Sequence, residues 1–137
     1  MSIPLIDKSN YLKGLLILAR KDNNISEIQR SLILKAGKQL GFSTSFCEEI
    51  VNTLLQNECL SDEPIRFENY SVAQSFISDG IKLTCSGKKI IDAELDWLKK
   101  SAEINSINSN WFEEQLVQNE YIIKNPFAVQ LSLYSII

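Results

Sequence analysis

Histidine is absent from this 137-residue sequence, and its absence excludes many kinds of catalytic site and metal site. Histidine is the commonest general base, the usual partner of a serine or cysteine nucleophile, and the commonest ligand of transition metals. Without it, a metal ion would have to be a hard cation bound by oxygen atoms. Since no nucleophile–base pair is visible either, we expect a protein that is not an enzyme.

Three further absences limit the location and the partners of the chain. Its three cysteines, Cys47, Cys59 and Cys85, form no CxxC pair, which favours buried thiols in a reducing cytoplasm over a disulfide framework or a zinc site. Net charge is -3 and the basic residues form no long run, which argues against a nucleic-acid partner. No apolar run approaches the roughly 20 residues that cross a bilayer, and the N-terminal stretch lacks the apolar segment of a signal peptide. We therefore expect a cytoplasmic protein that is not inserted into a membrane.

Apolar residues recur at helical spacing in the first third of the chain. The range Leu12–Ala19 forms a wide apolar face and predicts a largely buried first helix. Ser26 is followed three positions later by Gln29, which is the pattern of a capping box at the start of a second helix. Gly41 stands where a glycine commonly ends a helix.

A third helix is expected to begin at Phe42–Ser43, with an apolar stripe that faces the core and consists of Phe46, Ile50, Val51 and Leu54. The segment SDEPIRFENYS, residues 61–71, interrupts the periodicity with a proline and several charges, and we interpret it as a connector. No alternation typical of a strand appears before the C-terminal tail. The pattern therefore predicts an all-α fold.

The helical pattern of the first part recurs later in the chain at a constant offset. When Leu18 is aligned with Leu83, Ile25 aligns with Ile90 and the cap residue Ser43 aligns with Asn108, without a gap. Each three-helix unit alone has too little core, and pairing the two buries both. We predict a single domain, residues 1–137, with repeat one at about 10–58, a connector at 59–70, repeat two at about 71–118 and a tail at 119–137.

The C-terminal tail carries two conflicting signals. Asn125–Pro126 is a good helix start, whereas Phe127, Val129, Leu131 and Leu133 alternate as in a strand. We favour a short final helix packed on the bundle, with a strand as the alternative. Because the chain ends in two isoleucines, the tail could also join two copies of the chain in a homodimer.

The two units resemble the TerB family of helical domains, named for tellurite resistance. Residues of the first unit that match the family pattern are Ala19, Asp22, Ile25, Ser26, Glu27, Leu40 and Gly41. Those of the second unit are Ile90, Asp92, Glu94, Leu95 and Trp97. The similarity covers about residues 10–118.

The resemblance implies a compact bundle of about seven helices with internal pseudosymmetry and no defined reaction. It also implies a bacterial cytoplasmic protein with a protein-interaction role in a stress response such as tellurite resistance. A related domain occurs in a membrane-anchored DnaJ-like co-chaperone. Family members have been proposed to bind metal ions through acidic residues in the two turns.

The acidic turns are therefore the candidate metal site, and calcium or magnesium is the candidate ion. The oxygen-bearing candidates are Asp22, Asn24 and Glu27 in the first turn and Asp92 and Glu94 in the second. The first turn lacks the mid-loop glycine of a calcium loop, and lysines occupy the second turn where ligands would be needed. The simpler interpretation is that both turns are helix caps whose acids favour a helix N-terminus.

Cys85 also has two interpretations. Nearby lysines, Lys88 and Lys89, could lower the pKa of its thiol and make it reactive. A small core residue is the alternative. The sequence thus leaves two classes of function, a protein-interaction module and a divalent-cation binding domain.

Overall fold

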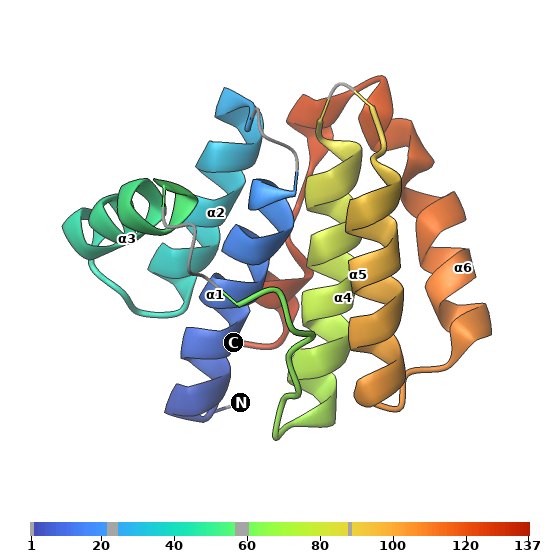
Figure 1. Ribbon diagram of the computed structural model, residues 1–137, viewed down its shortest axis with the longest axis horizontal. Coiled ribbons are helices and arrows are strands. Elements are labelled where there is room, and N and C mark those ends of the chain that lie inside the picture. Colours follow the sequence, from blue (N-terminus) through green and yellow to red (C-terminus); the bar gives the residue numbers. More distant parts are fainter. Residues whose placement is uncertain (1, 22–24, 57–60, 88) are drawn as a thin grey trace.

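The computed structural model describes residues 2–21, 25–56, 61–87 and 89–137, and within these ranges the chain is all-helical (Figure 1). Its α-helices are α1 (Leu5–Arg20), α2 (Glu27–Gln39), α3 (Thr44–Gln56), α4 (Tyr70–Cys85), α5 (Asp92–Ile104) and α6 (Ser109–Asn119). Three short 3-10 helices follow, η1 (Glu120–Ile123), η2 (Pro126–Ala128) and η3 (Ser132–Ser135). The all-α prediction is confirmed. The described residues form six α-helices, however, and not the expected seven, because the tail adds only single 3-10 turns.

The helix bounds recur along the chain at the same offset that aligns Leu18 with Leu83. α1 and α4 correspond at both ends and have equal lengths, and so do α2 and α5. The start of α3 likewise corresponds to the start of α6. This agreement fits the internal repeat predicted from the sequence, although the repeat itself stays a prediction.

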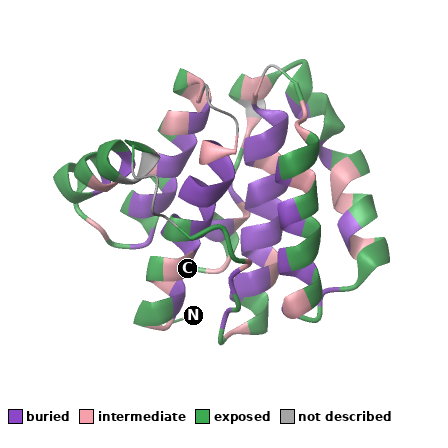
Figure 2. Cartoon of the chain, viewed as in Figure 1, coloured by how far each residue is buried: buried purple, intermediate pink, exposed green. Residues whose placement is uncertain are grey.

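α1 and α4 occupy the centre of the bundle, with α2 and α3 on one side and α5 and α6 on the other (Figure 1). Buried residues concentrate on this central pair (Figure 2). Between these two helices, Phe76 of α4 packs edge-on against Tyr11 of α1, with ring centroids 5.4 Å apart. Phe76 also packs edge-on against Trp97 of α5, with ring centroids 6.0 Å apart. Trp97 is a core residue in this structure.

Local signals in the sequence account for the start and end of α2. Ser26 and Gln29 form the predicted capping box, in which each side chain accepts a hydrogen bond from the other residue's backbone N–H. The Gln29 side-chain amide also donates to the carbonyl of Leu83 at 3.0 Å, which fixes the start of α2 against the end of α4. Gly41 follows the helix with a φ of +96°, a conformation that favours glycine.

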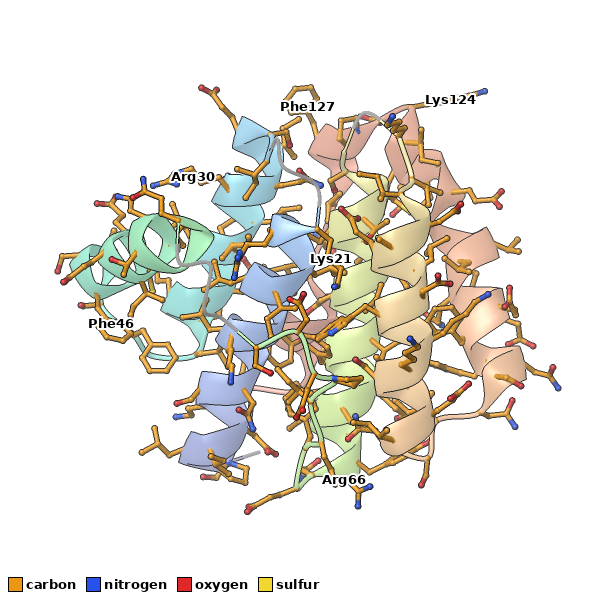
Figure 3. All side chains as sticks on the ribbon, viewed as in Figure 1. Lys21, Arg30, Phe46, Arg66, Lys124 and Phe127 are labelled. Atoms are coloured by element: carbon orange, nitrogen blue, oxygen red, sulfur yellow. The ribbon has the colours of Figure 1, made fainter. Side chains whose placement is uncertain are left out.

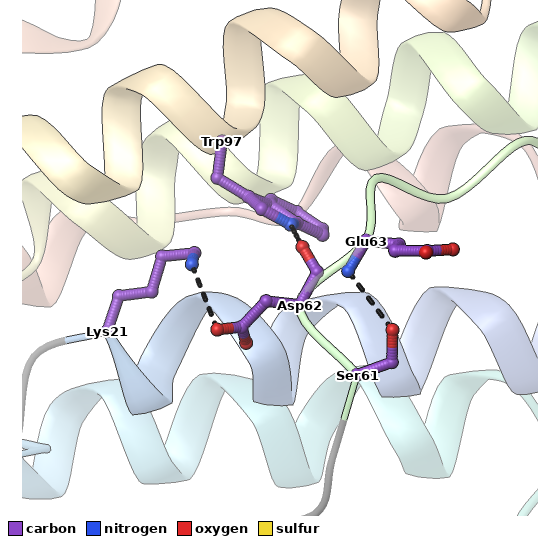
Figure 4. A network of polar contacts seen from close by, with 5 residues as sticks. All are labelled: Lys21, Ser61, Asp62, Glu63 and Trp97. Carbon is purple, nitrogen blue, oxygen red and sulfur yellow. Dashed lines mark hydrogen bonds and ion pairs between the residues drawn. The ribbon is translucent and has the colours of Figure 1, made fainter.

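Polar contacts, among them those of the buried Asp7, hold the connector between the two halves. The Asp7 carboxylate of α1 accepts hydrogen bonds from the backbone N–H groups of Glu68 and Asn69, at 2.9 and 3.0 Å. Nearer the start of the connector, the Trp97 indole donates to the Asp62 carbonyl at 2.8 Å, and the Asp62 carboxylate lies 3.8 Å from the Lys21 ammonium (Figure 4). The connector is therefore attached to α1, to α5 and to the residue that follows α1.

The tail returns across α4, and its last turn, η3, also contacts α2 (Figure 1). Its residues Leu131 and Leu133 are buried in the core. The described tail forms short 3-10 helices and no strand, and η2 begins at Pro126, so the favoured short helix is present in 3-10 form. Of the helices formed by the described residues, none is both long and apolar enough to cross a bilayer.

Candidate functional site

An apolar groove of about 280 Å³ lies between α1 and α3. We refer to it as the α1–α3 groove. Its lining residues are Ser9, Leu12, Lys13 and Leu16 of α1, with Phe42, Phe46 and Ile50 on the α3 side. The groove is the candidate functional site because it presents apolar side chains to solvent at a helix–helix junction.

The floor and the wall of the groove come from different helices. Leu12 and Leu16 lie one turn apart on α1 and are buried, so they form a fixed floor. Phe42 and Phe46 form the wall, with ring centroids 5.4 Å apart. Ile50, one turn farther along α3, is half-buried.

The prediction that Phe46 faces the core is wrong, since 42% of its surface is exposed. Val51 of the predicted stripe is buried as expected, and the buried side of α3 also contains Cys47, which was not in the prediction. Only α1 and α2 make substantial contact with α3 among the described elements, so no further helix covers the side of α3 that carries Phe46. Figure 3 shows the Phe46 side chain on the α3 side of the molecule, away from α4, α5 and α6.

The apolar surface of α1 continues beyond the groove. Leu5 precedes Ser9 by four positions and Leu12 by seven, so the three lie on one face of the helix. Leu5 is 72% exposed. The strip on α1 from Leu5 to Leu16 therefore extends about 16 Å, or about three helical turns.

The structure does not gather the predicted metal ligands into a cluster. Among the residues it describes, no three acidic or cysteine side chains come together as a possible metal site. Glu27 and Asp92 are exposed at the first positions of α2 and α5. Asp22 and Asn24 lie outside the described residues, so the cation hypothesis stays a prediction.

Glu94 differs from the other candidates because it is buried. It occupies the first turn of α5 together with Asp92, where a carboxylate is stabilised by the helix macrodipole. Glu94 already has an interaction partner. A position in a helix start accounts for both acids without a metal ion.

The structure favours the core interpretation of Cys85, which is buried, while Lys88 lies outside the described residues. Burial raises the pKa of Cys85 to about 11, and the carboxylates of Glu120 and Glu94 add to the increase. Burial likewise raises the pKa of Cys47. Both of these cysteines are buried in the structure, as expected for core residues.

Sequence reasoning missed a buried polar network where the tail meets α4. Asp79 is fully buried and accepts hydrogen bonds from the hydroxyl of Tyr11 and from the backbone N–H groups of Ser132 and Leu133. The neighbouring Lys82 ammonium donates to the Gln130 carbonyl at 2.8 Å and to the Ser132 hydroxyl at 2.9 Å. The signal in the sequence was an acid, Asp79, between the apolar residues Ile77 and Ile81 of α4.

Comparison with known proteins does not assign a function to the α1–α3 groove or to the polar network around Asp79. Comparison of the chain with protein-family models, with curated proteins and with solved structures finds no match. The resemblance to the TerB family therefore rests on the residues quoted above. A function for this chain has to be argued from the α1–α3 groove and from the chemistry of the described residues.

Proposed function

We propose that this protein is a non-enzymatic helical module that binds an amphipathic helix of a partner protein in the α1–α3 groove. The observation that carries the proposal is the aromatic wall of Phe42 and Phe46 above a buried leucine floor. Protein interfaces are centred on such pockets, which bury aromatic and aliphatic anchor residues.

The dimensions of the surface favour a helix as the occupant. The strip from Leu5 to Leu16 matches about three turns of a partner helix. A helix in a groove presents apolar residues at positions i, i+4 and i+7, and these anchors span about two turns. The α1–α3 groove and its continuation on α1 are long enough for all three anchors.

The charge at the groove indicates which residues the partner helix should carry. Lys13 is exposed and carries the one charge among the described lining residues. An acidic residue next to the apolar anchors would pair with Lys13 and orient the helix. We therefore propose a partner helix with three apolar anchors and a flanking aspartate or glutamate.

The biological setting follows from the family resemblance. We propose a bacterial cytoplasmic module of a stress response, built from two pseudo-symmetric TerB-like repeats. The recurrence of helix bounds at a constant offset supports the repeat. In this proposal the groove belongs to the first repeat.

A displayed library of helical peptides, selected on the purified protein, tests the proposed function. We expect selected peptides to share apolar residues at i, i+4 and i+7 and an acid beside them. Because hot-spot aromatics dominate binding energy, Phe46→Ser should weaken the selected peptides about tenfold or more.

The matched control is Phe127→Ser, which removes an even more exposed phenylalanine, 86% accessible, outside the groove. This control should bind the peptides as the wild type does. Selection of peptides whose affinity is unchanged by Phe46→Ser, or is equally reduced by both variants, would contradict the proposal.

A further inference from the structure

A second, polar hollow of about 400 Å³ lies beside α4, on the other half of the chain. Ser78 and Lys82 line it from α4, and Gln115, Gln118 and Asn119 line it from α6. The tail contributes to the hollow as well, so three separate segments converge on it. Nothing in the proposed protein-binding function uses this site.

The lining is almost entirely made of neutral hydrogen-bonding groups. Side-chain amides of glutamine and asparagine supply both donors and acceptors, and Tyr121 adds a phenol. Among the described lining residues, Lys82 alone is charged. The hollow therefore combines one positive charge with several polar contacts, and none of its described lining residues is a carboxylate.

Lys82 is held in place by the tail. Its ammonium donates to the Gln130 carbonyl and to the Ser132 hydroxyl, which leaves one of its three N–H donors for another acceptor. The Ser78 hydroxyl lies 2.7 Å from the Ser132 hydroxyl and completes the arrangement. Burial lowers the pKa of Lys82, and the nearby Asp79 carboxylate opposes this shift.

We infer that this hollow binds a small hydroxylated carboxylate, such as a sugar acid or a hydroxy acid. The remaining N–H of Lys82 meets the carboxylate of the ligand, and the amides of Gln115 and Gln118 meet its hydroxyl groups. The buried Asn119 amide donates to the Gln115 carbonyl at 2.7 Å and holds this side of the hollow in place. A ligand of this class is held here by one charge-assisted hydrogen bond and a few neutral ones, so we expect a dissociation constant of about 1 mM.

Bound ligand also bridges α4, α6 and the tail. The lining residues Gln130 and Ser132 come from the last part of the tail, where the N–H groups of Ser132 and Leu133 donate to the Asp79 carboxylate. Ligand binding therefore stabilises the docked tail. Hydrogen exchange at these two N–H groups should slow when the hollow is occupied.

Titration of the full-length protein with D-gluconate, followed by NMR, tests the inference. The side-chain amide signals of Gln115 and Gln118 should shift and saturate. D-Glucose, which lacks the negative charge, should bind at least about fivefold more weakly, because a charge-assisted hydrogen bond is stronger than a neutral one. Cationic D-glucosamine should cause no saturable shift.

Two variants locate the site. Lys82→Gln should abolish gluconate binding, whereas Lys124→Gln, which removes an exposed lysine outside the hollow, should leave it unchanged. Since Lys82 also anchors the tail, Gln118→Leu serves as a second variant at an exposed lining position and should weaken binding about fivefold. Absence of saturable shifts at about 10 mM gluconate, shifts that map elsewhere, or equal binding of glucose would overturn the inference.

Discussion

Asp79 places a carboxylate in the centre of the bundle, where three hydrogen-bond donors converge on it. Tyr11 reaches it from α1, and the backbone N–H groups of Ser132 and Leu133 reach it from the tail. Burial raises the pKa of Asp79, although these hydrogen bonds and the charge of Lys82 act in the opposite direction. One side chain thus joins α1, α4 and the tail.

The raised pKa of Asp79 predicts a specific dependence of stability on pH. The folded chain holds this proton to a higher pH than the unfolded chain, so unfolding releases a proton between the two pKa values. The free energy of unfolding contributed by Asp79 is therefore greatest below the unfolded pKa of about 3.9 and falls as the pH rises through the folded value. Asp79→Asn cannot ionise and should lack this fall.

Asp79→Asn should also destabilise the protein at every pH, by about 1–3 kcal/mol, because the amide replaces an acceptor with a donor that faces backbone N–H groups. Urea unfolding of both proteins between pH 4 and pH 8 provides the measurement. The difference between them should narrow as the pH rises. A difference that widens instead would show that the hydrogen bonds outweigh burial.

The sequence indicates this residue but not its partners. The acid at position 79 lies within a run of buried positions in α4, and in the sequence one residue separates it from Ile77 and one from Ile81. Its hydrogen bonds, however, join residues 53 to 68 positions apart. Such contacts depend on how the tail returns over the bundle, and no local pattern encodes that path.

At the scale of elements, local sequence signals predicted where helices begin and end, but they did not predict which helix sides are exposed to solvent. The capping box at Ser26 and the glycine at position 41 define α2 because both act within a few residues. The exposure of Phe46 depends on which helices cover α3, and amphipathic spacing does not contain that information. The α1–α3 groove could therefore not be predicted, although its apolar residues were visible in the pattern.

Gly14 determines how closely α1 approaches α4. A Cβ atom at this position would lie 2.5 Å from Cζ of Phe76. The ring has little freedom to move, because Phe76 is fully buried among the aromatic rings of Tyr11, Phe67 and Trp97. Glycine is thus required here by close packing and not by backbone conformation.

Gly14→Ala should lower the free energy of unfolding. Overpacking costs about 1–3 kcal/mol, and the better helix propensity of alanine recovers at most about 1 kcal/mol of it. Thermal unfolding measures the net change, with Lys13→Ala as a control at the adjacent exposed position, expected within about 0.5 kcal/mol of the wild type. A Gly14→Ala protein more stable than the wild type would mean that the ring of Phe76 can yield.

At the scale of the whole molecule, the connector and the tail are held in the same way. In each case a buried carboxylate on a central helix accepts hydrogen bonds from the backbone of the segment. Asp7 binds consecutive N–H groups of the connector, at Glu68 and Asn69, and Asp79 binds consecutive N–H groups of the tail. Each segment follows a three-helix unit and packs on the α1–α4 pair. The connector is joined covalently to a helix at both of its ends, whereas the tail continues covalently from α6 alone and is held on α4 by packing and hydrogen bonds.

Removal of residues 126–137 should therefore destabilise the bundle strongly. The truncation exposes the surface that Leu131 and Leu133 cover, and each buried leucine contributes about 1.5–3 kcal/mol. It also removes two hydrogen-bond donors from the buried Asp79. Since domains are stable by only about 5–15 kcal/mol, we expect a large fall in melting temperature, measured by circular dichroism.

The same truncation distinguishes two roles of the tail. The tail either packs in the core of its own chain or joins two copies of the chain in a homodimer. Gel filtration of the full chain at several concentrations, beside the truncated chain, reports the oligomeric state. Phe127→Ser is the matched control, because it alters the most exposed apolar residue of the tail and leaves the buried leucines in place. A truncated chain that keeps its melting temperature but elutes as a smaller species would make the tail a homodimer surface. A fall in melting temperature without a change of oligomeric state places its stabilising role within one chain.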